Sequence, residues 1–288
     1  MGTGEYRLKH LIVTADDFGR SPAVNEAVEE AFSTGILTAA SLMVGAEAAS
    51  DAIERGKRLG GLGVGLHLVV VCGRPVLPRS EIPDLLNADG AFDTNLVRAG
   101  FRYFFLPRAR RQLAREIRAQ FEAFRASGLE LDHVNAHNHM HLHPTVLSLI
   151  LSIGPAFGMR AVRVPDEPAA VPGAQTPSVP ARMGRAFLGL WLGLMRRRLA
   201  RAGIRINDRV FGIRDSGQMV RERLLAMLAE LPDGVTEIFS HPARGPWDGV
   251  EAAAAHYRFE EEFQALIDPD VKSAVAVSGA TSTPFRGI

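Results

Sequence analysis

The chain has 288 residues, a hydrophobic content of 47% and a formal net charge of +1. This length suits one α/β domain with a substantial core, and the near-zero charge argues against a nucleic-acid-binding protein. Cys72 is the only cysteine, which excludes an internal disulfide framework. No apolar run reaches the roughly 18–20 residues of a membrane-spanning helix. We therefore expect a cytoplasmic protein with a single domain, residues 1–288, and a lid or insertion around residues 165–205.

Apolar runs alternate with amphipathic stretches along the chain. Residues 11–15 predict a buried strand, and Pro22–Thr34 predicts a helix for which Ser21 is the N-cap. Residues 111–127 have the apolar spacing of a helix. Repeated strand-helix units favour a parallel α/β barrel or sheet. Further strands are expected at residues 39–44, 63–71, 160–164, 210–213, 237–240 and 275–277, and further helices at residues 46–59 and 144–157.

Two clusters of polar residues indicate a metal site. Five of the nine histidines lie within residues 133–143, and most of them alternate, which suits one face of an extended segment. Asp16 and Asp17 follow the first predicted strand. Imidazoles and carboxylates are the ligands of hydrolytic divalent metals, zinc in particular. Together these residues indicate a metal-dependent hydrolase.

The candidate residues lie at the ends of predicted strands. In parallel α/β folds the functional groups gather at the carboxyl ends of the strands. We therefore expect the candidates to meet at one rim of the barrel. The residues at such ends are Asp16, Asp17, His67, His137 and His241.

Several motifs carry a family resemblance. Thr-Ala-Asp-Asp-Phe-Gly at residues 14–19, Gly-Leu-His at 65–67, Asn-Ala-His-Asn-His-Met-His at 135–141 and Ser-His-Pro at 240–242 resemble the YdjC/ChbG-like carbohydrate deacetylases. The resemblance covers most of the chain and keeps the order of the motifs.

Three further segments, residues 39–45, 73–78 and 131–137, resemble the hopanoid-biosynthesis-associated branch of this family, HpnK. Members of that branch are associated with removing the N-acetyl group from a glucosamine-bearing hopanoid lipid. This resemblance implies N-deacetylation that releases acetate and a free amino sugar.

The family resemblance also implies a fold and a set of roles. The fold would be a distorted parallel (β/α) barrel of the polysaccharide-deacetylase type, with a divalent metal bound by one aspartate and two histidines. Zinc fits such ligands best, while Mg²⁺, Co²⁺, Ni²⁺ and Mn²⁺ stay open. Asn138 interrupts the run of adjacent histidines that relatives have, so His139 is a second candidate ligand. The implied roles are Asp17, His67 and His137 as metal ligands, Asp16 as general base, His241 as general acid, and Arg163 as the residue that positions the base.

Each candidate also has a purely structural interpretation. Two aspartates after a strand commonly start a loop or cap a helix, and an isolated His67 or His241 is commonly structural. The histidine cluster is harder to explain in this way, because a core rarely tolerates five imidazoles without partners. His133, His141 and His143 are expected to be structural or to line a pocket. Cys72 is expected to be a buried neutral thiol.

Two segments bear on the substrate. Residues 101–111 mix aromatic side chains with arginines, and the apolar residues 187–195 precede three arginines. Such a segment suits an interfacial helix that contacts a membrane surface, while a lid or a dimer helix is the alternative. We expect a glycolipid or amino-sugar substrate near His139 and Trp191, peripheral contact with the inner membrane, and a homodimer.

Other functions fit parts of the same pattern. A deacetylase of soluble chito-oligosaccharides would use the same site without the lid, and another barrel hydrolase could use the same ligands. A non-catalytic, metal-dependent sugar- or lipid-binding protein is the alternative outside the enzymes. The presence of both Asp16 and His241 favours catalysis, because binding alone needs no acid-base pair.

Overall fold

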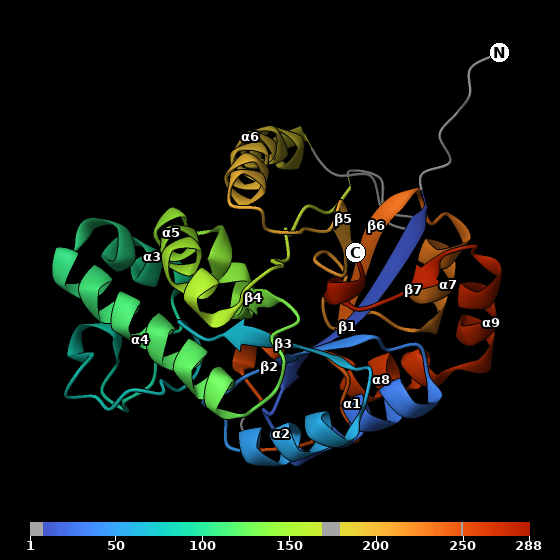
Figure 1. Cartoon of the computed structure of the whole chain (residues 1–288), viewed down its shortest axis with the longest axis horizontal. Coiled ribbons are helices and arrows are strands. Elements are labelled where there is room, and N and C mark those ends of the chain that lie inside the picture. The colour runs from blue at the N-terminus through green and yellow to red at the C-terminus, as the bar shows by residue number, and fades with distance from the viewer. Residues whose placement is uncertain (1–7, 169–178, 249) are drawn as a thin grey trace.

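The computed structural model describes residues 8–168, 179–248 and 250–288. In these residues seven strands form one parallel sheet (Figure 1). Its central strand β1 (Lys9–Phe18) lies between β2 (Ala39–Leu42) and β6 (Gly234–Ser240). The order is β4-β3-β2-β1-β6-β5, and β7 pairs with the start of β1. The other strands are β3 (Gly63–Leu68), β4 (Val134–Ala136), β5 (Arg209–Phe211) and β7 (Thr281–Ser282).

Isolated bridges continue the sheet from β4 back toward β5. Val134 of β4 bridges to Val162, and Ala161 bridges to Arg205, which lies shortly before β5. The amide of Val162 donates to the carbonyl oxygen of Arg205 at 3.0 Å. These bridges curl the sheet round on itself. The predicted distorted parallel α/β barrel is therefore confirmed.

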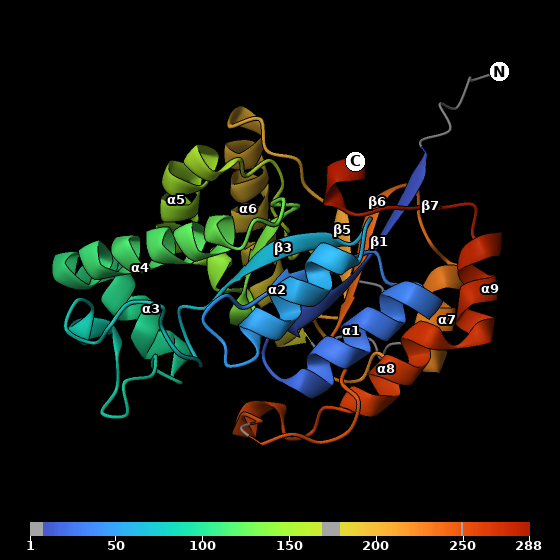
Figure 2. The same cartoon turned by 60° about the horizontal axis from the view of Figure 1, so that its bottom comes forward.

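Helices cover the outside of the sheet. Figures 1 and 2 show α3, α4 and α5 gathered at one end, and α7, α8 and α9 at the other. The helices are α1 (Pro22–Thr34), α2 (Ala49–Arg58), α3 (Leu96–Phe105), α4 (Pro107–Ala126), α5 (Pro144–Ile153), α6 (Val179–Arg201), α7 (Arg221–Ala229), α8 (Phe259–Ile267) and α9 (Pro269–Val277). Short 3₁₀ helices are η1 (Pro83–Leu85), η2 (His137–Leu142), η3 (Gly154–Phe157), η4 (Ala252–Ala254) and η5 (Phe285–Gly287).

The sequence predicted most elements near the sheet, and some predictions were wrong. The helix Pro22–Thr34 is confirmed with its cap, since the Ser21 hydroxyl accepts from the amide of Val24 at 3.2 Å. Residues 275–277 were expected as a strand but end α9, because a short apolar run does not distinguish a strand from a helix. Residues 160–164 form only isolated bridges. The helices α3, α7 and α8 were not predicted.

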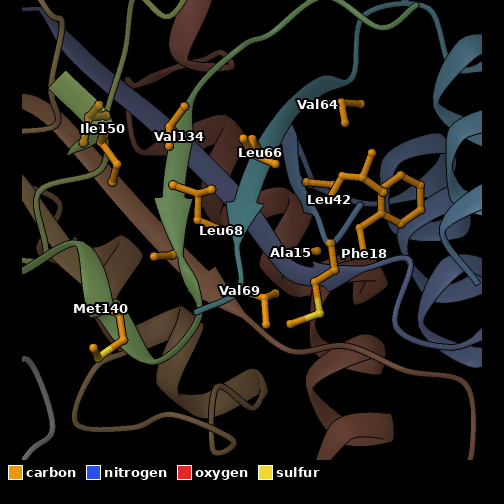
Figure 3. Close-up of a cluster of buried hydrophobic side chains, with 14 of the residues drawn as sticks. Ala15, Phe18, Leu42, Val64, Leu66, Leu68, Val69, Val134, Met140 and Ile150 are labelled. Carbon is orange, nitrogen blue, oxygen red and sulfur yellow. The ribbon is translucent and has the colours of Figure 1, made fainter. Parts of the chain in front are cut away.

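Side chains alternate between two environments along the strands. Figure 3 shows Val64, Leu66 and Leu68 of β3 in the main hydrophobic core. Gly65 and His67 point the opposite way, into the barrel, because successive side chains in a strand face opposite sides. The outward faces therefore make the core, and the inward faces are left for small and polar residues.

The inward face of β3 makes room for a buried histidine. The His133 ring lies 3.0 Å from the Ser41 hydroxyl and 2.9 Å from Asp132 Oδ2 through its two nitrogens. It also stacks on Phe285, with ring centroids 4.6 Å apart. Both nitrogens of His133 are thus satisfied, and the expected structural role is borne out by these contacts. A Cβ on Gly65 would lie 2.4 Å from the His133 ring.

We predict that Gly65→Ala destabilises the fold. The added methyl group would displace the His133 ring from its stack, and overpacking of this kind typically costs about 1–3 kcal/mol. Urea unfolding would measure the loss. Gly60→Ala is the control, because no atom lies within 4 Å of its added Cβ. Equal stability of the two variants would contradict this account.

A buried carboxylate holds the chain in place directly after β6. Glu262 of α8 is fully buried, and it accepts from the amide of Met219 at 2.9 Å and from the amide of His241 at 2.5 Å. Burial raises the pKa of Glu262 to about 7, despite these donors. The folded protein therefore keeps this proton at a pH where an exposed glutamate loses it.

The position of Glu262 predicts a pH-dependent stability. Because the folded pKa lies above the ordinary value of 4.5, the contribution of this group to stability is complete below pH 4.5 and is lost as the pH rises through 7. The loss amounts to about 3 kcal/mol. Chemical unfolding of Glu262→Gln and of the parent at pH 4.5 and pH 8 checks this, since glutamine does not titrate. Parallel stability profiles would refute it.

Candidate metal centre and active site

The site lies where the inward faces of the strands reach the carboxyl edge of the sheet. Along β1, Thr14 and Asp16 face the barrel interior, where they contact Glu237 and Arg163. Leu11, Val13 and Ala15 belong to the main core on the other face. The predicted convergence on one rim is thereby seen for four strands. The inward residues nearest this edge are Asp16 from β1, His67 from β3, Asn135 from β4 and Phe239 from β6.

Asp16 and Asp17 reach the same site although they are adjacent in a strand. Neighbouring strand residues normally point to opposite faces. Asp17 has a positive φ of 64°, and the pairing of β1 with β2 shifts register between Ala15 and Phe18. This backbone irregularity turns the Asp17 carboxylate back toward the interior. A non-glycine residue held in this conformation is typical of functional sites.

Asp17, His67 and His137 form a compact group of donor atoms. Asp17 Oδ1 lies 3.3 Å from His67 Nε2 and 3.1 Å from His137 Nδ1, and the two nitrogens are 3.4 Å apart. All three residues are buried, and their donor atoms lie within 4.8 Å of one another. One carboxylate and two imidazoles fit a divalent cation, and three protein ligands leave room for water and substrate. The predicted grouping of these three residues is confirmed.

A buried amide fixes which nitrogen of His67 faces this group. Asn135 Nδ2 donates to Asp16 Oδ1 at 3.0 Å and to the Ser41 hydroxyl at 2.9 Å, so its Oδ1 must point toward His67. That oxygen lies 2.7 Å from His67 Nδ1. An amide oxygen only accepts, and Nδ1 of His67 therefore carries the proton. Nε2 keeps its lone pair for a metal.

His137 and Asp17 form an ion pair in the metal-free protein. Burial opposes the charge on His137, but the Asp17 and Glu251 carboxylates outweigh it and raise the pKa of His137 to about 9. Burial likewise opposes the charge on Asp17, whereas His137 and Arg20 hold the pKa of Asp17 well below its usual range. A cation bound here would replace the proton of His137, so metal binding at this site is linked to proton release.

Asp16 is held by a fully buried guanidinium. Arg163 donates to Asp16 Oδ2 at 2.6 Å and to Oδ1 at 3.0 Å. The same guanidinium donates to Glu237 at 2.7–3.0 Å and lies over the Phe239 ring. Despite burial, Arg163 and His67 keep the pKa of Asp16 far below its usual range. Asp16 is therefore ionised at every physiological pH, with an orientation set by Arg163.

His241 follows β6 directly and lies among aromatic rings. Its ring centroid is 5.1 Å from that of Tyr257 and 5.7 Å from that of Phe239. Its Nδ1 is buried and has no hydrogen-bond partner among the described residues. Burial lowers the pKa of His241, while the nearby Asp17 and Asp16 oppose this effect. The resting imidazole is neutral at pH 7.

The histidine segment is extended only at its start. Val134–Ala136 forms β4, but Asn138 and His139 both have φ of 52°, and the chain turns there into a 3₁₀ helix. The expectation that the alternating histidines share one face of an extended segment is therefore wrong beyond Ala136. His139 lies outside the three-residue group, with its ring 5.4 Å from Phe239. Burial and the charge of Arg163 lower the pKa of His139 to about 3.

Trp191 is on α6 and contacts the chain near the end of the histidine cluster rather than the donor group itself. The indole N–H of Trp191 donates to the carbonyl oxygen of Leu142 at 2.8 Å, while Leu190 and Leu194 on the same helix are exposed. The lid expected around residues 165–205 falls partly on residues 169–178, which lie outside the described part of the chain. Among the described helices, none combines the length and the apolar character needed to cross a membrane.

A cavity of about 300 Å³ opens beside the donor group. Two residues of its wall, Arg20 and Glu251, also contact the donors: Arg20 pairs with Asp17 at 2.8 Å, and Glu251 lies 3.3 Å from His137. Cys72 is only partly buried, so the expectation of a buried thiol is wrong on this point; partial burial, reinforced by Glu251, still raises the pKa of Cys72 to about 11, which keeps the thiol neutral at pH 7. The wall also contains Met43, Val69, Arg74, Trp247 and Asp248.

Sequence reasoning missed four residues that support the site. Asn135 stands between His133 and His137 at the alternating spacing, which could have marked it as inward-facing. Glu237 lies two residues before Phe239 on the inward face of β6. This pattern can be recognised only when the position of the strand is known. No sequence signal joins Arg20 to Glu251, because 231 positions separate them.

The chain matches known proteins over most of its length. The family model described as "YdjC-like protein" matches residues 10–277. A carbohydrate deacetylase of Geobacillus stearothermophilus is 29% identical over 96% of this chain and 97% of its own length, and one of Mus musculus is 31% identical over 93% and 91%.

Among solved structures, a protein of Enterococcus faecalis V583 described as a candidate cellobiose-phosphate cleavage protein aligns with a TM-score of 0.71. Its sequence identity is 21%, and the alignment covers 97% of this chain and 98% of that one. At this identity the likeness concerns the fold. With its family model matched over nearly all of its length, the chain belongs to the YdjC-like protein family.

Proposed function

We propose that this protein is a metal-dependent carbohydrate N-deacetylase, which hydrolyses an acetamide to acetate and a free amino sugar. The observation that carries the proposal is the group of Asp17, His67 and His137 next to an ionised Asp16. Full-length relatives in the family are named carbohydrate deacetylases, which supports the same reaction. Zinc is the proposed metal, because two imidazoles and one carboxylate are typical zinc ligands.

Asp16 is the proposed general base. A divalent metal at the donor group would lower the pKa of a water molecule and polarise the acetamide carbonyl. Asp16 lies beside the group, since its Oδ1 is 4.0 Å from His67 Nδ1. Arg163 fixes the orientation of the carboxylate by two hydrogen bonds and keeps it ionised, so its oxygens are free to accept a proton from water.

His241 is the proposed general acid. The amine can leave only after it has received a proton. The buried Nδ1 of His241 has no hydrogen-bond partner among the described residues, so this nitrogen is free to carry that proton. The resting imidazole is neutral, but Asp16 and Asp17 already pull its pKa upward. Negative charge that develops on the acetamide during attack adds to this pull. His241 would therefore take up a proton from solvent as this charge develops and pass it to the leaving nitrogen.

The cavity beside the donor group is the proposed sugar subsite. Its volume of about 300 Å³ is at the lower end of the range for small-molecule sites. Trp247 offers an apolar ring, and Arg74 and Asp248 offer groups for sugar hydroxyls. His139 and Trp191 remain proposed substrate contacts.

A lipid-linked amino sugar is the proposed substrate. The resemblance to HpnK suggests an N-acetylglucosaminyl hopanoid, and two exposed apolar surfaces support an amphipathic ligand at an anionic membrane. On α3, Phe101 and Phe105 are 60% and 59% exposed and contact each other. On α6, Leu190 is 78% exposed. Exposed apolar groups gathered in this way commonly mark an interaction surface.

We predict that Asp16→Asn reduces deacetylation by about 10²–10⁴-fold, because general base catalysis is lost. Mass spectrometry of an N-acetylglucosaminyl hopanoid and of a chito-oligosaccharide would detect the loss of one acetyl group. His241→Gln tests the acid separately. Asp89→Asn is the control, since Asp89 is exposed and lies outside both the donor group and the wall of the cavity.

The two substrates separate the alternatives. Loss of acetyl only from the oligosaccharide would keep the reaction and remove the lipid. No loss from either substrate, with zinc bound, would favour a non-catalytic sugar- or lipid-binding protein. A second measurement, zinc binding by Asp16→Asn, should match the parent, because Asp16 is outside the proposed ligand set.

We predict that replacing exposed apolar residues weakens membrane binding. The variants Phe101→Ser with Phe105→Ser, and Leu190→Ser with Leu194→Ser, should each reduce sedimentation with phosphatidylglycerol vesicles several-fold. Val277→Ser on α9 is the control, since Val277 is 84% exposed and lies at the other end of the molecule. Unchanged sedimentation with a change from dimer to monomer would assign these surfaces to self-association instead.

A further inference from the structure

Glu251 stands outside the proposed ligand set but touches it. It lies just before η4, in the long connection between β6 and α8. Its Oε1 is 3.3 Å from His137 Nε2 and 2.9 Å from Arg20 Nη2. Arg20 in turn donates to Asp17 Oδ2 at 2.8 Å. Two of the three proposed ligands are thus joined through one ion pair.

We infer that Glu251 is a positioning residue of the metal site, which holds the Nε2–H of His137 and thereby presents Nδ1 to the metal. This inference rests on the proposed function only in taking Asp17, His67 and His137 as the ligands. A carboxylate oxygen accepts, so the hydrogen on His137 must be on Nε2 when Nδ1 binds a cation. Outer partners of this kind fix the tautomer and the ring orientation of a ligating histidine.

The two histidines are held by different partners. Asn135 gives His67 a neutral acceptor at 2.7 Å inside the barrel, whereas Glu251 gives His137 an anionic acceptor nearer the surface. The anionic partner makes the imidazole of His137 a stronger base and a stronger ligand.

Arg20 offsets the negative charge that Glu251 brings close to Asp17. Without it, Glu251 would add a negative charge close to Asp17. The side chains of Arg20 and Glu251 are only 15% and 22% exposed, so the pair is shielded from much of the solvent screening that weakens surface ion pairs. Arg20 is itself positioned by the turn after β1, where its amide donates to the Asp17 carbonyl oxygen at 3.0 Å.

The role of Glu251 can be separated from a role in folding. Among the described contacts, its side chain meets only Arg20 and His137, and its connection lies at the rim of the barrel rather than in the core. Asp248 is a matched neighbour, because it lines the same cavity from the same connection and has no described contact with a proposed ligand.

Zinc titration of the metal-free protein against a chromophoric chelator tests the inference. Glu251→Ala should weaken zinc binding by about 10–100-fold, Glu251→Gln by less because its amide oxygen still accepts, and Asp248→Asn by no more than about twofold. The melting temperature of metal-free Glu251→Gln should stay near that of the parent, because its amide oxygen still accepts from Arg20 and His137, whereas a purely structural role would lower the melting temperature together with zinc affinity.

Zinc affinity of Glu251→Ala equal to that of the parent would overturn the inference, as would absence of zinc binding by the parent or an equal loss in Asp248→Asn. The titration contains no sugar, so it is independent of the proposed reaction. Weakened zinc binding in Glu251→Ala together with no deacetylation by the parent would keep the positioning role and reject the deacetylase.

Discussion

The buried guanidinium of Arg163 is the interaction on which the site and the barrel both depend. It joins β1 through Asp16 and β6 through Glu237, and it comes from the irregular segment whose bridges continue the ring of strands. Removing one partner of such a buried pair typically costs about 3–5 kcal/mol, because the other charge is left without compensation. One cation facing two anions leaves a negative charge, and Asp17 adds a second once a bound metal has displaced the proton of His137. A divalent cation would neutralise both.

Much of the fold could be predicted because parallel strands carry a simple pattern. Residues 11–15 are mostly apolar and are followed by two aspartates, while residues 238–239 are apolar and are followed by Ser240 and His241; both segments lie in strands as expected. The pattern fails where backbone pairing is irregular, as at residues 160–164, where burial is high but regular pairing is absent. It also fails at residues 275–277, where three small or branched residues finish a helix.

The site was predictable to the extent that its residues stand at strand ends. His67, His137 and Asp17 were expected together and lie together. The positive φ of Asp17 and the turn at Asn138 could not be foreseen, because neither residue is a glycine and nothing in their neighbours requires that conformation. Contacts such as Arg20 with Glu251 depend on the path of a long connection, which local patterns do not determine.

The raised pKa of Cys72, the only cysteine in the chain, affects how this residue responds to oxidants. With the pKa of Cys72 at about 11, roughly one molecule in 10⁴ carries the reactive thiolate at neutral pH. The thiol donates weakly to the Thr94 carbonyl oxygen, with a separation of 3.7 Å. Peroxides and alkylating reagents attack thiolates, so Cys72 reacts with them only slowly. The cavity is therefore not lost through modification of this cysteine, unlike the site of an enzyme that carries an activated cysteine beside its metal.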